Sequence, residues 1–108
     1  MNDLVALDLD DGIATVALTD QDRRNALSTD MFDAIEAAIT TVEANDTTNV
    51  LRLRAEGTAF CAGFDLKAMA EDAMLPDFLH RLGGLCRRLR DLHAVVVMEV
   101  QGPAIAGG

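Results

Sequence analysis

Residues 50–66 read VLRLRAEGTAFCAGFDL, a short alternating run followed by a turn and a loop of small and apolar residues. Apolar residues alternate with Arg52 and Arg54 at the start, so a strand here would place both arginines on one face. Residues 60–66 are too apolar for an ordinary surface loop, and Gly63 would let their backbone approach a ligand closely. The stretch predicts a strand that leads into a glycine-containing loop.

The C-terminal stretch repeats this order. Residues 94–100, AVVVMEV, predict a largely buried strand, and residues 101–108, QGPAIAGG, follow it. Open α/β sheets place ligands at the C-terminal ends of their strands. Two backbone N–H groups from such loops could hold a developing oxyanion, although tight packing explains glycines here more simply. No Gly-x-Gly-x-x-Gly or Walker pattern is present, so a nucleotide-phosphate cradle is not supported.

The remaining sequence predicts a hairpin and two helices. Asp11-Gly12 between residues 4–9 and 13–18 is typical of a tight hairpin turn. Ser28 or Thr29 can cap a helix that fades near Asn45. Its apolar face is Phe32, Ile35, Ile39 and Val42.

A second helix is expected to start near Pro76, because proline suits a first helical turn. We expect its Leu85 face, and the Phe32 face of the first helix, to pack against segments beyond Gly108. The order β-β-α-β-α-β implies crossover connections and the α/β class.

Composition limits the class of protein. The 108 residues suffice for one small domain, and the net charge of −9 argues against nucleic acid or anionic membrane as a partner. Cys61 and Cys86 have no metal-ligand spacing with the histidines and are expected to be free thiols. No signal peptide or membrane-spanning run is recognisable, so a cytoplasmic location is expected.

Three motifs resemble those of the enoyl-CoA hydratase/isomerase (crotonase) family. Residues 23–28, RRNALS, are similar to the signature between the first hairpin and first long helix of its members. Residues 60–66, FCAGFDL, resemble the family loop F-[CS]-[AS]-G-x-D-[LI], and residues 100–108, VQGPAIAGG, resemble the start of its later glycine-rich turn. The resemblance implies that residues 1–108 form the N-terminal portion of a crotonase-like domain, an incomplete ββα spiral core.

The same resemblance implies roles for individual residues. The backbone N–H groups of Phe64 and Gly107 would form an oxyanion hole, and the Phe64 ring would shape the acyl pocket. Other motif positions would bind the substrate: Arg24 and Ala26 along the coenzyme A arm, Ala62, Asp65 and Leu66 at its adenine end, and Arg23 or Lys67 at its phosphates. No cofactor is implied beyond the coenzyme A of the substrate, and no metal site is expected.

The implied activity is that of a lyase or isomerase acting on acyl-CoA thioesters in fatty acid metabolism. Members of the family are usually homo-oligomers. Their hydratase-type catalytic glutamates lie beyond the position of Gly108, so this chain is expected to be inactive alone. The alternatives are a non-catalytic coenzyme A-binding or assembly module, and a gene fragment without function. Ala106 stands where the family usually has glycine, which costs stability if its φ is positive.

Several residues have simpler explanations than catalysis. Cys61 is expected to pack within its loop, because no histidine is near it in the sequence. Asp65 is expected to fix its loop or contact coenzyme A and not to act as a general base. The arginines of the second helix, Arg87, Arg88 and Arg90, are expected to form a solvated face.

Overall fold

The chain begins with a β-hairpin. The computed structural model describes residues 4–67, 70 and 75–108. Strands β1 (Val5–Asp10) and β2 (Ile13–Leu18) pair antiparallel, with Asp10 opposite Ile13. Asp11 and Gly12 have φ values of 49° and 81°, the left-handed conformation that a two-residue hairpin turn requires. The predicted hairpin is confirmed.

Helix α1 (Thr29–Glu43) follows a side-chain cap. The Ser28 hydroxyl accepts a hydrogen bond from the Met31 amide at 3.1 Å, which satisfies one of the free N–H groups of the first turn. The predicted apolar face is the buried one: Phe32, Ile35, Ile39 and Val42 all lie in the core.

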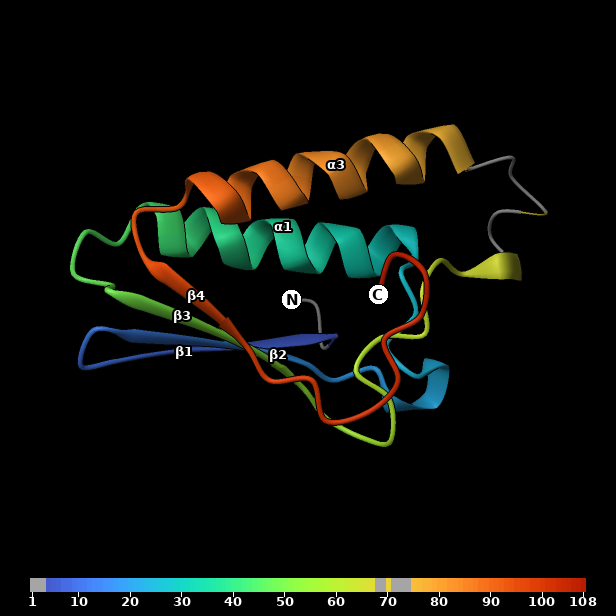
Figure 1. Ribbon diagram of the computed structural model, residues 1–108, viewed down its shortest axis with the longest axis horizontal. Coiled ribbons are helices and arrows are strands. Elements are labelled where there is room, and N and C mark those ends of the chain that lie inside the picture. The colour runs from blue at the N-terminus through green and yellow to red at the C-terminus, as the bar shows by residue number, and fades with distance from the viewer. Residues whose placement is uncertain (1–3, 68–69, 71–74) are drawn as a thin grey trace.

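Two crossovers add parallel strands to the hairpin. Strand β3 (Val50–Ala55) pairs with β2, and β4 (Val95–Met98) pairs with β3 after helix α3 (Leu75–Asp91). The four strands therefore lie in the order β1-β2-β3-β4. Helices α1 and α3 both cover the same face of this sheet (Figure 1).

The core fills the space between the sheet and the two helices. Alternation along β3 directs Leu51 and Leu53 into it and leaves Arg52 exposed on the other face. Phe32 and Leu85 are both buried within this chain. Phe32 packs against Phe78 of α3, and both belong with Leu85 to one apolar cluster. The expectation that these helix faces also pack against segments beyond Gly108 stays a prediction. No described helix has the length and apolar character needed to cross a membrane.

The burial of strand β4 differs from what the sequence predicted. Residues 94–100 were expected to form a largely buried strand, yet Val95 is 66% exposed, and Val97 and Met98 are also exposed. The strand is the outermost of the sheet and pairs with β3 on one side only. Val95 and Val97 lie beside Val50 and Arg52 of β3, on the face of the sheet that the two helices leave uncovered.

Candidate active site

The first motif, residues 23–28, forms a tight turn that follows the hairpin in the chain. The short helix η1 (Gln21–Arg23) is followed by Arg24 and Asn25, which both have positive φ, at 53° and 58°. The Asn25 amide donates to the Asp20 carbonyl at 2.9 Å and closes the turn. After this turn, the direction of the chain allows the Leu27 backbone to pair with the second motif, residues 60–66.

The second motif lies against the first. The Ala62 amide donates to the Arg24 carbonyl at 3.0 Å, and the Leu27 amide donates to the Gly63 carbonyl at 2.7 Å. A return bond from the Asp65 amide to the Leu27 carbonyl, at 3.0 Å, makes Leu27 and Phe64 a short parallel bridge. Segments that are nearly forty residues apart in the sequence are thus joined through their backbones.

The third motif lies on the other side of the second. The Phe60 and Cys61 amides donate to the Pro103 carbonyl at 3.0 and 3.2 Å, and the Ile105 amide donates to the Cys61 carbonyl at 3.0 Å. Figure 1 shows the segment after β3 and the C-terminal segment lying side by side. The approach requires glycine: a Cβ on Gly102 would lie 2.3 Å from the Thr58 carbonyl oxygen.

Gly107 lies against the Phe64 side chain. A Cβ on Gly107 would lie 3.4 Å from the Phe64 ring and 2.9 Å from the Leu82 side chain. Within the described part of the chain, neither the Phe64 nor the Gly107 amide donates to a backbone carbonyl. Ala106, just before Gly107, has a φ of 51°, which is the costly case for a side chain with a methyl group.

An apolar cavity of about 190 Å³ adjoins these segments. Its wall includes Leu27 of the first motif, Phe60 and Cys61 of the second, and Gly107 and Gly108 of the third. The rest comes from the sheet and from α1 and α3. Its lining contains no carboxylate among the described residues. Burial raises the pKa of the Cys61 thiol, whose Sγ donates to the Asn25 carbonyl at 3.1 Å. A thiol held protonated in this way is a packing group and a poor nucleophile.

The residues predicted to contact coenzyme A lie along the contact between the first two motifs. Arg23 and Arg24 are exposed, and the Arg23 guanidinium lies 3.9 Å from the Asp65 carboxylate. Asp65 also accepts from the Lys67 amide at 3.1 Å. Ala26 and Ala62 are half-buried, whereas Leu66 and Lys67 are exposed, Leu66 to 74%. No cluster of three or more metal-ligating side chains occurs among the residues that the structure describes.

Comparison with known proteins identifies the family to which the chain belongs. The family model for enoyl-CoA hydratase/isomerase matches residues 8–108. The chain belongs to the enoyl-CoA hydratase/isomerase family. A Mycobacterium leprae protein named probable enoyl-CoA hydratase echA6 is 34% identical over 101 residues, which are 91% of this chain and 40% of that protein.

Solved structures of the family have the same fold. An enoyl-CoA hydratase/isomerase from Xanthobacter autotrophicus is 30% identical with a TM-score of 0.87, over 99% of this chain and 42% of that one. An enoyl-CoA hydratase from Bacillus anthracis, at 23% identity, superposes with a TM-score of 0.90 over 97% of this chain and 42% of that one. The chain thus spans about two fifths of the length of the relatives that it matches.

Two residues of this family member were missed by the sequence reasoning. Asn25 and Gln101 stand inside the quoted motifs, but no role was expected for either. Their side-chain amides both donate to the Ala59 carbonyl, at 3.1 and 3.2 Å. The only signal was their amide chemistry next to glycine-containing segments, because the partner carbonyl lies far away in the sequence.

Glu99 is the acidic residue nearest in sequence to the third motif, but it lies outside the site. Its carboxylate binds Arg52 through two hydrogen bonds on the exposed side of the sheet. The hydrogen bond from Arg52 holds the pKa of Glu99 below its ordinary value. Glu99 is therefore an ion-pair partner and is poorly suited to accept a substrate proton.

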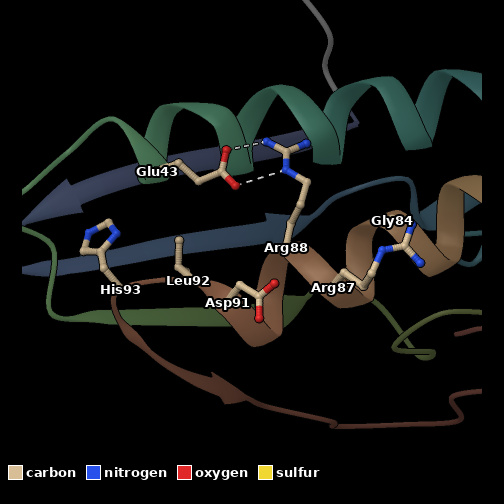
Figure 2. Close-up of a pocket in the computed structure, with 7 residues that line it drawn as sticks. All are labelled: Glu43, Gly84, Arg87, Arg88, Asp91, Leu92 and His93. Atoms are coloured by element: carbon tan, nitrogen blue, oxygen red, sulfur yellow. Dashed lines mark hydrogen bonds and ion pairs between the residues drawn. The ribbon is translucent and has the colours of Figure 1, made fainter.

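A larger hollow, of about 510 Å³, lies elsewhere in this enoyl-CoA hydratase/isomerase family member (Figure 2). Its wall comes from the C-terminal ends of α1 and α3 and from His93, and it contains none of the predicted site residues. Figure 2 shows Arg88 directed at Glu43, with which it forms two hydrogen bonds, at 2.7 and 3.1 Å. Acidic and basic groups balance one another here, so the hollow lacks the charge selectivity of an anion site.

Proposed function

We propose that the protein acts on acyl-CoA thioesters as an enoyl-CoA hydratase/isomerase-type enzyme. The thioester oxygen would bind to the backbone N–H groups of Phe64 and Gly107. The observation that carries this proposal is the backbone pairing of residues 60–61 with residues 103–105, together with the Phe64 ring lying against Gly107. Family membership supports the substrate class.

The proposed chemistry follows from where charge develops. Removing a proton from the α-carbon, or adding water at the β-carbon, transfers negative charge to the thioester oxygen. A pre-positioned N–H donor stabilises such an oxyanion by about 2.7–4 kcal/mol. The apolar wall of the adjoining cavity excludes water and so strengthens each hydrogen bond. The acyl group would enter from the side of the Phe64 ring.

The coenzyme A moiety would lie along the contact between the first two motifs. Arg23, Arg24 and Lys67 would supply positive charge for its phosphates, in a protein whose net charge is −9. Arg24 and Ala26 would lie along the arm, while Ala62, Asp65 and Leu66 would border the adenine end. No cofactor beyond the coenzyme A of the substrate is proposed.

We also propose that residues 1–108 bind and polarise a thioester without completing the reaction. Among the described residues no carboxylate lines the cavity, so a group that moves the proton is not provided there. The same observation favours a second candidate, a non-catalytic coenzyme A-binding module. Cytoplasmic location and homo-oligomer formation of the complete protein are proposed as well. The free thiols of Cys61 and Cys86 fit a reducing compartment.

Titration with crotonyl-CoA tests these proposals. The purified chain should bind crotonyl-CoA and shift the infrared band of its thioester carbonyl to lower frequency, with no hydration. The matched control is the butyl thioether of coenzyme A, which lacks the carbonyl and should bind more weakly. Binding without a band shift would favour the non-catalytic module. Turnover would contradict the proposed inactivity, and absence of binding would overturn the proposed substrate class for this chain.

A further inference from the structure

One backbone carbonyl connects all three motifs. The Ala59 oxygen accepts a hydrogen bond from Asn25 Nδ2 at 3.1 Å and another from Gln101 Nε2 at 3.2 Å. Asn25 belongs to the first motif, Ala59 directly precedes the second, and Gln101 belongs to the third. Both acceptor positions of this carbonyl are therefore occupied by side chains from the segments on either side.

Each of the two amides also binds a second carbonyl of the same turn. Asn25 Nδ2 donates to the Glu56 oxygen at 3.1 Å, and Gln101 Nε2 donates to the Gly57 oxygen at 3.1 Å. Only a primary amide places two N–H donors on one neutral nitrogen. The turn of residues 56–59 is thus held on both sides by side-chain amides, which donate hydrogen bonds to its carbonyl oxygens.

The turn determines where the next residues lie. Phe60 and Cys61 follow Ala59 and donate to the Pro103 carbonyl, two positions after Gln101. The side-chain bond of Gln101 and these backbone bonds therefore join the second and third motifs at neighbouring points. Gly102 lies between those points, where only glycine fits against the Thr58 carbonyl.

We propose that Gln101 is a positioning residue of the oxyanion site. Through the Ala59 carbonyl it fixes the segment that contains Gly107 relative to the segment that contains Phe64, while Asn25 holds the same carbonyl from the first motif. This inference rests on the proposed function. Gln101 does not touch the substrate; it acts through the backbone of residues 57–61.

The test compares Gln101→Leu with Gln21→Leu in the full 108-residue chain. Gln21 is the matched control, because its side-chain amide contacts the same turn at Glu56, at 3.5 Å, but does not bind Ala59. The readouts are the infrared carbonyl band of bound crotonyl-CoA and the Kd values for crotonyl-CoA and for free coenzyme A. Free coenzyme A reports on the groove without the thioester carbonyl.

For Gln101→Leu we expect a smaller band shift and roughly tenfold weaker crotonyl-CoA binding, since misplacing a group by about 1 Å has effects of this order or larger. Binding of free coenzyme A should stay within about twofold, and Gln21→Leu should match the parent chain. Gln101→Glu, which keeps the shape but removes the N–H donors, should reproduce the loss at pH 7.

The outcomes separate the two proposals. If the unsubstituted chain binds crotonyl-CoA without a band shift, the oxyanion site itself is wrong. If the unsubstituted chain shifts the band and both Gln101 variants shift it equally, the positioning role is overturned. Equal weakening of crotonyl-CoA and free coenzyme A would also overturn it, because it would indicate general damage to the groove.

Discussion

At the scale of single residues, Asn25 is a buried polar group whose side-chain oxygen and nitrogen are both hydrogen-bonded. It is fully buried, has a left-handed backbone and uses both ends of its side-chain amide, since its Oδ1 accepts from the Asp20 amide at 2.9 Å. Burial of a polar side chain is tolerated only when its hydrogen bonds are made. Asn25 therefore stabilises the turn only as long as all of its partners stay in place.

We predict that Asn25→Ala lowers the free energy of unfolding by about 3 kcal/mol. The estimate sums three lost hydrogen bonds of about 1 kcal/mol each, and the Ala59 carbonyl keeps its bond from Gln101. Urea unfolding followed by circular dichroism measures it. Asn45→Ala is the control, because Asn45 makes its side-chain bonds to Thr47 in an exposed turn. A loss at Asn25 no larger than the loss at Asn45 would contradict the prediction.

The sequence predicted local residue roles and missed distant ones. The Ser28 cap and the Asp11-Gly12 turn follow from chemistry within four residues, and both are confirmed. The partners of Asn25 and Gln101 are carbonyls 31 to 44 positions away. Such contacts depend on how the crossovers place the segments, which no local pattern encodes. The assigned roles of Phe64 and Gly107 remain predictions that came from family resemblance.

At the scale of elements, ion pairs tie α3 to α1. Arg81 binds Asp33 and Glu36 at 2.6 and 2.7 Å, and its guanidinium lies 5.0 Å from the centre of the Phe32 ring. One turn before the end of α3, Arg88 binds Glu43. The helices therefore meet through arginines on α3 and carboxylates on α1, beside an apolar contact between Phe32 and Phe78.

The Glu43–Arg88 pair predicts an acid-dependent contribution to stability. The hydrogen bond from Arg88 lowers the pKa of Glu43 below its ordinary value of 4.5. A carboxylate with a lowered pKa contributes stability that is complete above the ordinary value and disappears as the pH falls through the lowered one. Glu43→Gln should therefore reduce the free energy of unfolding at pH 7, by less than about 1 kcal/mol because the pair is partly exposed.

Thermal unfolding of the parent chain and Glu43→Gln at pH 7 and pH 2.5 tests this sign. The difference in Tm should be present at pH 7 and small at pH 2.5. Glu56→Gln is the control, since among the described residues the Glu56 carboxylate accepts only a weak 3.5 Å bond from Gln21. A difference for Glu43→Gln that is the same at both pH values would show that the pair has no electrostatic component.

At the scale of the whole molecule, the two edges of the sheet differ in character. Strand β1 presents Asp8 and Asp10, whereas β4 presents Val95, Val97 and Met98. Charged edges resist pairing with other chains, and apolar edges favour it. The sequence identified β4 as apolar but could not show that it is an edge strand of these four, because edge position follows from how all four strands pair.

We predict that the isolated chain self-associates through the β4 edge and that Val95→Lys suppresses the association. Val95 is 66% exposed, so lysine at this position adds charge without disturbing the core. Sedimentation velocity over a range of concentrations measures the effect. Ala6→Lys is the control, because it makes the same charge change on exposed β1. Equal suppression by both variants would indicate a general effect of charge.

The order of strands in the sheet has a consequence for how the protein is made. That order is identical to the order in the sequence, so each strand pairs with the strand synthesised just before it. A chain emerging from the ribosome can therefore build this sheet one strand at a time. Each of the described strands after β1 already has its neighbour when it is synthesised. Each is added at the edge left by the strand before it, so the sheet can grow without inserting a strand between two others.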